Sequence, residues 1–359
     1  MSNSQPPVTW LLPVKNGMRY LRTTLESIAN QSYQNHKILV RDDGSTDGTG
    51  DELRRWIPSR IPGQIFSGSS LGVGRSLAFL VEHADSELCA RIDADDVNLP
   101  NRLERQVQFL SEHSNVGVVG SYVQTIDESG AKQEIWAYEN YDADIRWMTR
   151  YATRFCHPSV MFRRSLVLAA GNYRDFVYED GDLWLRMALL TDMHNMPEVL
   201  VYYRRSGSSL TGQVKDWLPV LRTVAHFNAA NLLPGVSDAS AALELWESSM
   251  PKRFKGTAAD PPAKMWHLTQ LSKSATLLAR RCGKPSDYFT RTDCFRNQHV
   301  SLKRRLLRRF GLGSLLRLRD FLSGAAINKR DHRLGSVGRG QQHNASSPIN
   351  RRTDLPSPK

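Results

Sequence analysis

Apolar and polar positions alternate along the first hundred residues in a way that predicts strands and helices in turn. Short apolar runs, typical of buried strands, are separated by segments in which apolar residues recur every three or four positions. The pattern predicts strands at 8–14, 37–40, 64–66 and 87–92 and helices at 20–28, 51–56 and 76–83. Because strands joined through helices pair in parallel by right-handed crossovers, we expect an α/β fold with a mainly parallel sheet flanked by helices.

The pattern becomes more mixed after residue 100 and mainly helical after residue 215. Further elements are predicted as helices at 103–111, 142–150 and from 179 onward, and as strands at 116–126 and 157–162. Beyond residue 326 the sequence is polar and rich in Gly, Ser, Asn and Arg, a composition typical of disorder. We therefore expect an α/β domain over 1–215, a helical C-terminal appendage over 216–325 and a disordered basic tail over 326–359.

Composition narrows the class of protein. Hydrophobic residues make up 40% of the 359 residues and charged residues 23%, so a wholly disordered chain is excluded. There is no apolar run of about 18 residues or more, so a transmembrane helix is not expected. The first residues lack the segments of a signal peptide, and the 4 cysteines are widely spaced. We expect reduced thiols in a cytoplasmic protein, without zinc or disulfides.

The net charge of +12 lies almost entirely in the C-terminal tail. Residues 301–359 hold 14 Lys and Arg against 3 Asp, a net +11, which leaves +1 for the rest of the chain. Basic and apolar residues alternate over 302–322, a pattern typical of an amphipathic helix on an anionic membrane surface. A helix packed on the α/β domain with a solvated basic face fits the same pattern equally well. No nucleic-acid partner is expected, because no recognition module is present.

Acidic residues follow two of the predicted strands. Asp93, Asp95 and Asp96 come directly after the strand at 87–92, and Asp42 and Asp43 follow an earlier strand. Three carboxylates so close together repel one another unless a cation such as Mg²⁺ or Mn²⁺ lies between them. A solvated acidic turn is the alternative reading. Because the carboxyl ends of parallel strands meet at one edge of a sheet, where ligands bind, we expect the two groups to converge there.

Several motifs follow one another along the first 210 residues. They are Pro13-Val14-Lys15-Asn16-Gly17, 25–33, 42–49, Asp93-Ala94-Asp95-Asp96 with 99–104 behind it, 157–162, and Glu179-Asp180 ahead of 182–186. Phosphate-binding GxxxxGK[ST] loops and GxSxG elbows are absent. In this order the motifs resemble the family 2 glycosyltransferases of the GT-A fold, and the resemblance covers about 8–210.

The resemblance implies an inverting transferase that uses a nucleotide-diphosphate sugar and a divalent metal, Mn²⁺ or Mg²⁺. It implies that Asp180 is the general base and that Asp95 and Asp96 meet the metal. The residues that it implies at the nucleotide sugar are Pro13, Val14, Asn16, Asp43, Arg75, Asp93, Asp95, His157 and Glu179. For His157 a packing role at a turn is equally open, and Glu179-Asp180 also suits the start of a helix.

The Gln-x-x-Arg-Trp motif of processive members is missing, since Ala143 stands where Gln would precede Arg146-Trp147. We therefore expect a non-processive enzyme that moves one sugar, with a UDP-sugar favoured as donor, to a hydroxyl of a glycan or lipid-linked acceptor. Surface polysaccharide or lipopolysaccharide synthesis is the expected pathway, in the cytoplasm or peripherally on the inner face of the membrane. A sugar nucleotidyltransferase and a non-catalytic nucleotide-sugar-binding protein are the alternatives.

Overall fold

The structure is a computed structural model that describes residues 5–207, 214–229, 235, 238–250 and 265–309. The chain divides into a compact unit, Met1–Leu306, and a second unit, Leu307–Lys359. Only the first unit is described below. The predicted disordered tail over 326–359 and most of the predicted basic segment over 302–322 lie outside the described residues.

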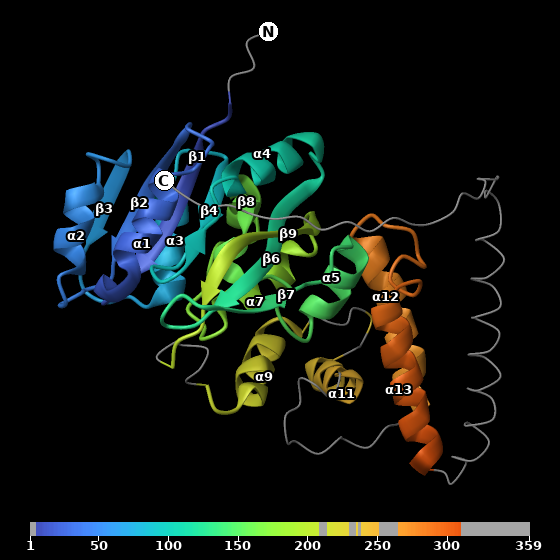
Figure 1. Cartoon of the computed structure of the whole chain (residues 1–359). Coiled ribbons are helices and arrows are strands. Elements are labelled where there is room, and N and C mark those ends of the chain that lie inside the picture. The colour runs from blue at the N-terminus through green and yellow to red at the C-terminus, as the bar shows by residue number, and fades with distance from the viewer. Residues whose placement is uncertain (1–4, 208–213, 230–234, 236–237, 251–264, 310–359) are drawn as a thin grey trace, which may run out of the picture. The chain divides into compact units, whose positions relative to one another are not determined.

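A nine-stranded sheet forms the centre of the first unit (Figure 1). Its strands follow the order β3-β2-β1-β4-β8-β6-β9-β5, and β7 pairs with β6. The strands are β1 (Val8–Val14), β2 (His36–Asp42), β3 (Gly63–Ser67), β4 (Leu88–Arg91), β5 (Val97–Asn98), β6 (Val116–Ile126), β7 (Lys132–Trp136), β8 (Met161–Arg163) and β9 (Asp192–Arg204). Strands β1 to β4 are parallel, which confirms the prediction from the alternating strands and helices. Beyond them the sheet is mixed, because β8 runs antiparallel to both β4 and β6.

Helices cover both faces of the parallel strands. The helices of the described residues are α1 (Met18–Ala29), α2 (Thr49–Trp56), α3 (Val73–His83), α4 (Arg102–Glu112), α5 (Asp142–Thr149), α6 (Arg164–Ala169), α7 (Glu179–Met187), α9 (Trp217–Phe227), α11 (Ala239–Ser249), α12 (Met265–Arg281) and α13 (Asp293–Arg309). Every residue of β1 is buried. Trp10 and Leu12 belong to one core with Leu21 of α1, whereas Leu11 belongs to a second core with Leu80 of α3. The α/β fold with its two helical layers is as predicted.

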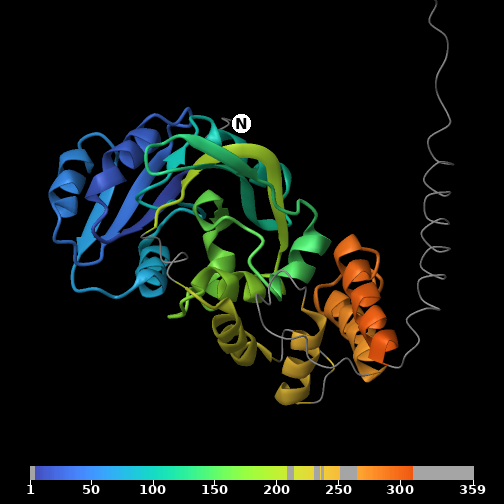
Figure 2. The ribbon, with the colours of Figure 1, turned by 60° about the horizontal axis from the view of Figure 1, so that its bottom comes forward.

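The later helices pack against α5, on the side of the sheet away from β3 (Figures 1 and 2). Trp147 of α5 is fully buried, and its Nε1 donates a hydrogen bond to Gln298 of α13 (2.5 Å). The hydroxyl of Tyr288 donates to Asp142 at the start of α5 (2.6 Å). Leu302, the first residue of the predicted basic segment, is buried in the same core. The helical appendage is therefore present, and the boundary near residue 215 stays a prediction.

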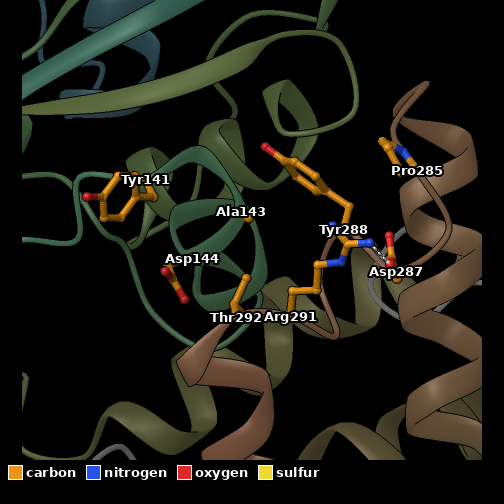
Figure 3. A pocket seen from close by; sticks show the side chains of 8 residues that line it. All are labelled: Tyr141, Ala143, Asp144, Pro285, Asp287, Tyr288, Arg291 and Thr292. Atoms are coloured by element: carbon orange, nitrogen blue, oxygen red, sulfur yellow. Dashed lines mark ion pairs between the residues drawn. The ribbon is translucent and has the colours of Figure 1, made fainter. Parts of the chain in front are cut away.

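A cavity of about 340 Å³ lies between α5 and the segment that joins α12 to α13 (Figure 3). Its lining residues are Tyr141, Ala143, Asp144, Pro285, Asp287, Tyr288, Arg291 and Thr292. Arg291 forms an ion pair with Asp287 across its edge. None of the candidate site residues lines this cavity. Among the described residues, no helix has the length and apolar character needed to cross a membrane.

The strand predicted at 157–162 is wrong in its first half. His157–Ser159 form a single 3-10 turn, and the strand β8 begins only at Met161. Pro158 has no N–H to donate to a sheet, and the N–H of Ser159 instead bonds back to the carbonyl of Cys156 (2.8 Å). His157 therefore lies on a turn beside the sheet.

Candidate active site

Three loops meet at the carboxyl edge of the parallel strands. They follow β1, β2 and β4, whose residues pair in register. Asn16 joins the first two loops, because its side-chain oxygen accepts a hydrogen bond from the N–H of Thr46 (2.8 Å) while its own N–H donates to Ser45 Oγ (2.9 Å). Asn16 has a positive φ of 53°, which asparagine adopts more readily than most residues. Pro13 and Val14, also predicted at the nucleotide, are buried in the last part of β1.

Asp43, at the end of β2, holds the loop between β3 and α3. Its carboxylate accepts four hydrogen bonds, and the donors are Ser70 Oγ (2.8 Å), Leu71 N (2.7 Å), Gly72 N (3.0 Å) and Ser76 Oγ (3.1 Å). Burial alone would raise the pKa of Asp43, but these bonds favour the anion and lower its pKa below the usual value. A nucleoside that donated a hydrogen bond to the Asp43 carboxylate would add to, or replace, the bonds from this loop.

The three acidic residues after β4 form a cluster, as predicted. One carboxylate oxygen from each of Asp93, Asp95 and Asp96 lies within 4.8 Å of the others. Asp96 is fully buried, its Oδ1 accepts from the N–H of Arg204 (2.7 Å), and within the described part of the chain its Oδ2 has no hydrogen-bond partner. Burial, together with the neighbouring carboxylates, raises the pKa of Asp95 to about 6 and that of Asp96 well above its usual value.

This cluster fits a divalent cation. A buried carboxylate oxygen without a partner is costly, and hard cations prefer several oxygen ligands. The loop is also fixed from outside, since Thr24 Oγ1 of α1 lies 2.8 Å from the carbonyl oxygen of Asp96. Arg204, at the end of β9, donates through Nε to the carbonyl oxygen of Asp95 (2.9 Å). The donor set and its rigid support match Mg²⁺ or Mn²⁺ better than a softer metal.

A buried arginine, Arg91, links this cluster to a second acidic group. Its Nη1 lies 2.5 Å from Asp93 Oδ2, and it also interacts electrostatically with Glu179 at the start of α7. Burial disfavours its charge, but Asp93 and Glu179 outweigh burial and raise the pKa of Arg91. Arg91 was not among the predicted site residues. A charged residue within an otherwise apolar strand was the available signal.

The second acidic group lies in the first turn of α7. Glu179 is buried, and burial raises its pKa to about 7. Asp180 is more exposed, and its Oδ1 accepts a hydrogen bond from the N–H of Gly181 (2.7 Å). Burial also raises the pKa of Asp180, helped by the charge of Glu179 and opposed by His157. Glu179 and Asp180 thus lie in the first turn of a helix, as predicted. Arg91 interacts electrostatically with both Asp93 and Glu179, which connects the two acidic groups.

His157 connects Glu179 to a tyrosine. Its Nε2 lies 2.9 Å from the hydroxyl of Tyr173, and its Nδ1 lies 3.5 Å from Glu179 Oε1. Burial and the nearby Arg91 lower the pKa of His157 to about 3, so its ring is neutral at physiological pH. Tyr173 was also missed, since nothing in its sequence neighbourhood distinguishes it.

Among the described residues, no hydrogen bond or ion pair joins Arg75 to the acidic cluster. It is exposed at the start of α3 and forms an ion pair with Asp175 (2.8 Å), in the loop that leads to α7. This pair connects the β3–α3 side of the site with the α7 side. Its predicted contact with phosphate stays a prediction.

Known proteins resemble this chain in sequence and in fold. The sequence model described as "Glycosyl transferase family 2" matches residues 9–169, which carry all three loops. The protein EpsE of Bacillus subtilis is 35% identical over 191 residues, which cover 51% of this chain and 67% of EpsE. The amylovoran biosynthesis glycosyltransferase AmsE of Erwinia amylovora is 32% identical over 201 residues, which cover 55% of this chain and 74% of AmsE. This chain belongs to the family 2 glycosyltransferases.

A third relative of this glycosyltransferase has a defined reaction. It is the UDP-Gal:alpha-D-GlcNAc-diphosphoundecaprenol beta-1,3-galactosyltransferase of Escherichia coli, 25% identical over 244 residues, which cover 65% of this chain and 87% of that enzyme. Among solved structures, TarS (residues 1–349) of S. aureus in complex with UDP-GlcNAc has a TM-score of 0.57 at 15% identity, and the match covers 85% of this chain and 92% of TarS. That likeness concerns the fold. The GT-A fold and the glycosyltransferase activity are thus confirmed, and the two alternative classes are set aside.

Proposed function

We propose that this glycosyltransferase moves a single sugar, with inversion, from a UDP-sugar to a hydroxyl of a lipid-linked or glycan acceptor in surface polysaccharide or lipopolysaccharide synthesis. The observation that carries the proposal is the pairing of two acidic groups, 93–96 and 179–180, through Arg91. The E. coli relative's UDP-sugar donor and lipid-linked acceptor support the donor and acceptor classes. A cytoplasmic location at the inner face of the membrane stays a prediction.

The acidic cluster after β4 is the proposed donor end of the site. Asp95 and Asp96 would hold a divalent cation, and Asp93 would face the ribose and sugar. When bound, the cation offsets the negative charge that develops on the departing diphosphate. The residues proposed to line the nucleoside and phosphate positions are Pro13, Val14, Asn16, Asp43 and Arg75.

Asp180 is the proposed general base. Inversion requires one carboxylate to take the proton from the acceptor hydroxyl as the new bond forms. Asp180 suits this role better than Glu179, because it is the more exposed of the two. His157, which is neutral, would keep Glu179 in place.

The test distinguishes the role of the proposed base from that of the proposed metal ligands by measuring the effect of a substitution in each. Transfer is measured from UDP-glucose, UDP-galactose and UDP-N-acetylglucosamine to octyl glycosides, and the product's anomeric configuration is read by NMR. Asp180→Asn is expected to lower kcat by about 10²–10⁴-fold while leaving the donor KM nearly unchanged. Asp95→Ala is expected to remove the dependence on Mn²⁺ along with the activity.

Asp51→Asn is the matched control, because Asp51 also lies in the first turn of a helix but is exposed and outside the site. It should leave both kcat and KM unchanged. Full activity of Asp180→Asn, or a product that retains the donor's anomeric configuration, would contradict the proposed mechanism.

A further inference from the structure

An exposed apolar patch lies beside the proposed general base. It consists of Phe176 and Val177, in the loop just before α7, and Phe227 at the end of α9. The side chain of Val177 is 68% exposed and that of Phe227 is 64% exposed. The rings of Phe176 and Phe227 contact each other, with centroids 5.2 Å apart. Contiguous exposed apolar side chains of this kind commonly mark binding surfaces.

Buried contacts fix this patch relative to Asp180. Asn228, which directly follows α9, donates a hydrogen bond through Nδ2 to Asp182 in the first turn of α7 (2.8 Å), and both residues are buried. At the other end of α9, the rings of Trp217 and Tyr178 pack edge to face, 5.8 Å apart. Both views show α9 beside α7 (Figures 1 and 2). These contacts fix α9, which carries Phe227, against α7, which carries the proposed base.

The other large apolar side chains that are exposed in the described structure are not grouped in this way. They are Ile135, Tyr141, Leu190 and Val300, and they belong to separate elements. Single exposed apolar side chains are ordinary on protein surfaces. Only at the patch do two of them lie next to the predicted catalytic carboxylates. A cation accompanies the patch, because Arg174 is exposed two residues before Phe176 and lies 3.5 Å from Asp182.

We propose that the patch binds the hydrocarbon chain of a lipid-linked acceptor, close to its anionic linkage. The inference rests on the proposed function and names its acceptor class. Because Asp180 has to reach the acceptor hydroxyl, the part of the acceptor that flanks this hydroxyl passes over the residues that flank Asp180. The patch is apolar and aromatic, and its edge carries Arg174 together with the exposed ion pair of Arg75 and Asp175. This combination matches an amphiphile with a phosphate linkage better than a fully polar glycan.

The test compares acceptors that differ only in their apolar part. With UDP-galactose, or whichever UDP-sugar proves active, KM is measured for methyl, octyl and dodecyl glycosides of the same sugar. The wild type is expected to show a KM at least about tenfold lower for the octyl than for the methyl glycoside, because each buried methylene favours binding. Val177→Ser and Phe227→Ser are expected to raise the octyl KM about 5- to 10-fold while the methyl KM and the donor KM stay unchanged.

Leu190→Ser is the matched control, because Leu190 is 49% exposed just after α7 and outside the patch. It should not change any KM. Thermal unfolding of each variant checks the fold, and these exposed positions should leave Tm unchanged. Equal effects on the methyl and octyl glycosides, or no dependence on chain length in the wild type, would overturn the inference.

Two further outcomes are distinguishable. If the patch variants keep their KM values but sediment less with vesicles of phosphatidylglycerol, the patch contacts the membrane and the acceptor proposal is wrong. If the wild type releases no UDP from any donor with any acceptor, the proposed function itself fails, and this inference fails with it. Normal UDP release with unchanged octyl KM in the variants contradicts the inference alone.

Discussion

Burial gives the two carboxyl groups at the start of α7 an unusual acid–base character. Glu179 has a pKa of about 7, and the pKa of Asp180 is also raised, first by burial and then by the charge of Glu179. Two carboxyl groups so close together lose their protons as a coupled pair. A base is effective only when it is deprotonated, so with Asp180 as the proposed base we expect activity to depend on pH in a range where an ordinary aspartate would not titrate.

The sign of the pH dependence follows from these shifts. Asp180 is protonated, and inactive as a base, below its raised pKa, so kcat/KM should rise with pH at values above those at which an ordinary aspartate loses its proton. Glu179→Gln removes the charge that raises the pKa of Asp180, so the rise should become a single step at lower pH. The pH profile of kcat/KM for the wild type and Glu179→Gln measures this. A midpoint that stays in place or moves to higher pH would contradict the electrostatic account.

Single residues show what the sequence could and could not reveal about the site. Three aspartates within four positions after a buried strand predicted the acidic cluster, because local spacing alone brings them together. The partners of that cluster come from distant segments. Arg91 forms a buried ion pair with Asp93, and Arg204 donates hydrogen bonds to Asp95 and Asp96. Local spacing does not bring Arg204 to the cluster, because it lies more than a hundred residues further along the chain.

At the scale of elements, α4 joins the strands of the site through one side chain. Arg102 is fully buried, and its guanidinium stacks over the ring of Trp10 (5.0 Å). Its acceptors are Asn98 Oδ1 (2.6 Å), the carbonyl oxygens of Pro158 (2.7 Å), Arg91 (2.9 Å) and Val160 (3.0 Å), and Gln106 Oε1 (3.1 Å). Burial lowers the pKa of Arg102 to about 9, which still leaves it charged at neutral pH. This residue therefore fastens the turn that carries His157 to the strand that carries Arg91.

Replacing Arg102 should be costly to stability. Arg102→Met leaves several buried acceptors without a donor, so we expect the free energy of unfolding to fall by about 3–5 kcal/mol in urea denaturation. Arg105→Met is the matched control on the same helix. Arg105 is partly exposed and pairs with Glu198 at the surface, so its loss should cost less than about 1 kcal/mol. Similar costs for the two variants would show that Arg102 does not hold these elements together.

The elements that the sequence predicted correctly have regular patterns, and those that it missed do not. Strands β1, β2 and β4 are buried on both faces and appear as continuous apolar runs. Strand β9 is 13 residues long but includes Pro197 and several polar residues, so its alternation is broken. Strand β5 has only 2 residues and exists because β9 pairs with it. Such pairing depends on the tertiary fold, which local sequence does not specify.

At the scale of the whole molecule, the residues that match the family model include the acidic cluster and the loops around it. The matched residues, 9–169, supply the three loops at the carboxyl edge. The proposed base lies just beyond them, at the start of α7. The helices after residue 216 bury Trp147 and complete a third core, which no local pattern could have shown. We propose that the carboxyl edge binds a nucleoside diphosphate through a metal held by the 93–96 cluster.

Thermal unfolding with nucleotides tests that claim most directly. Tm is measured with UDP, GDP, CDP and dTDP, each with and without Mn²⁺, for the wild type and Asp95→Ala. A ligand at about 100 times its Kd should stabilise the folded chain by about 2.7 kcal/mol. The account predicts that UDP raises Tm only when Mn²⁺ is present and that Asp95→Ala abolishes the increase. No stabilisation of the folded wild type by any nucleotide, or an undiminished increase in Asp95→Ala, would contradict it.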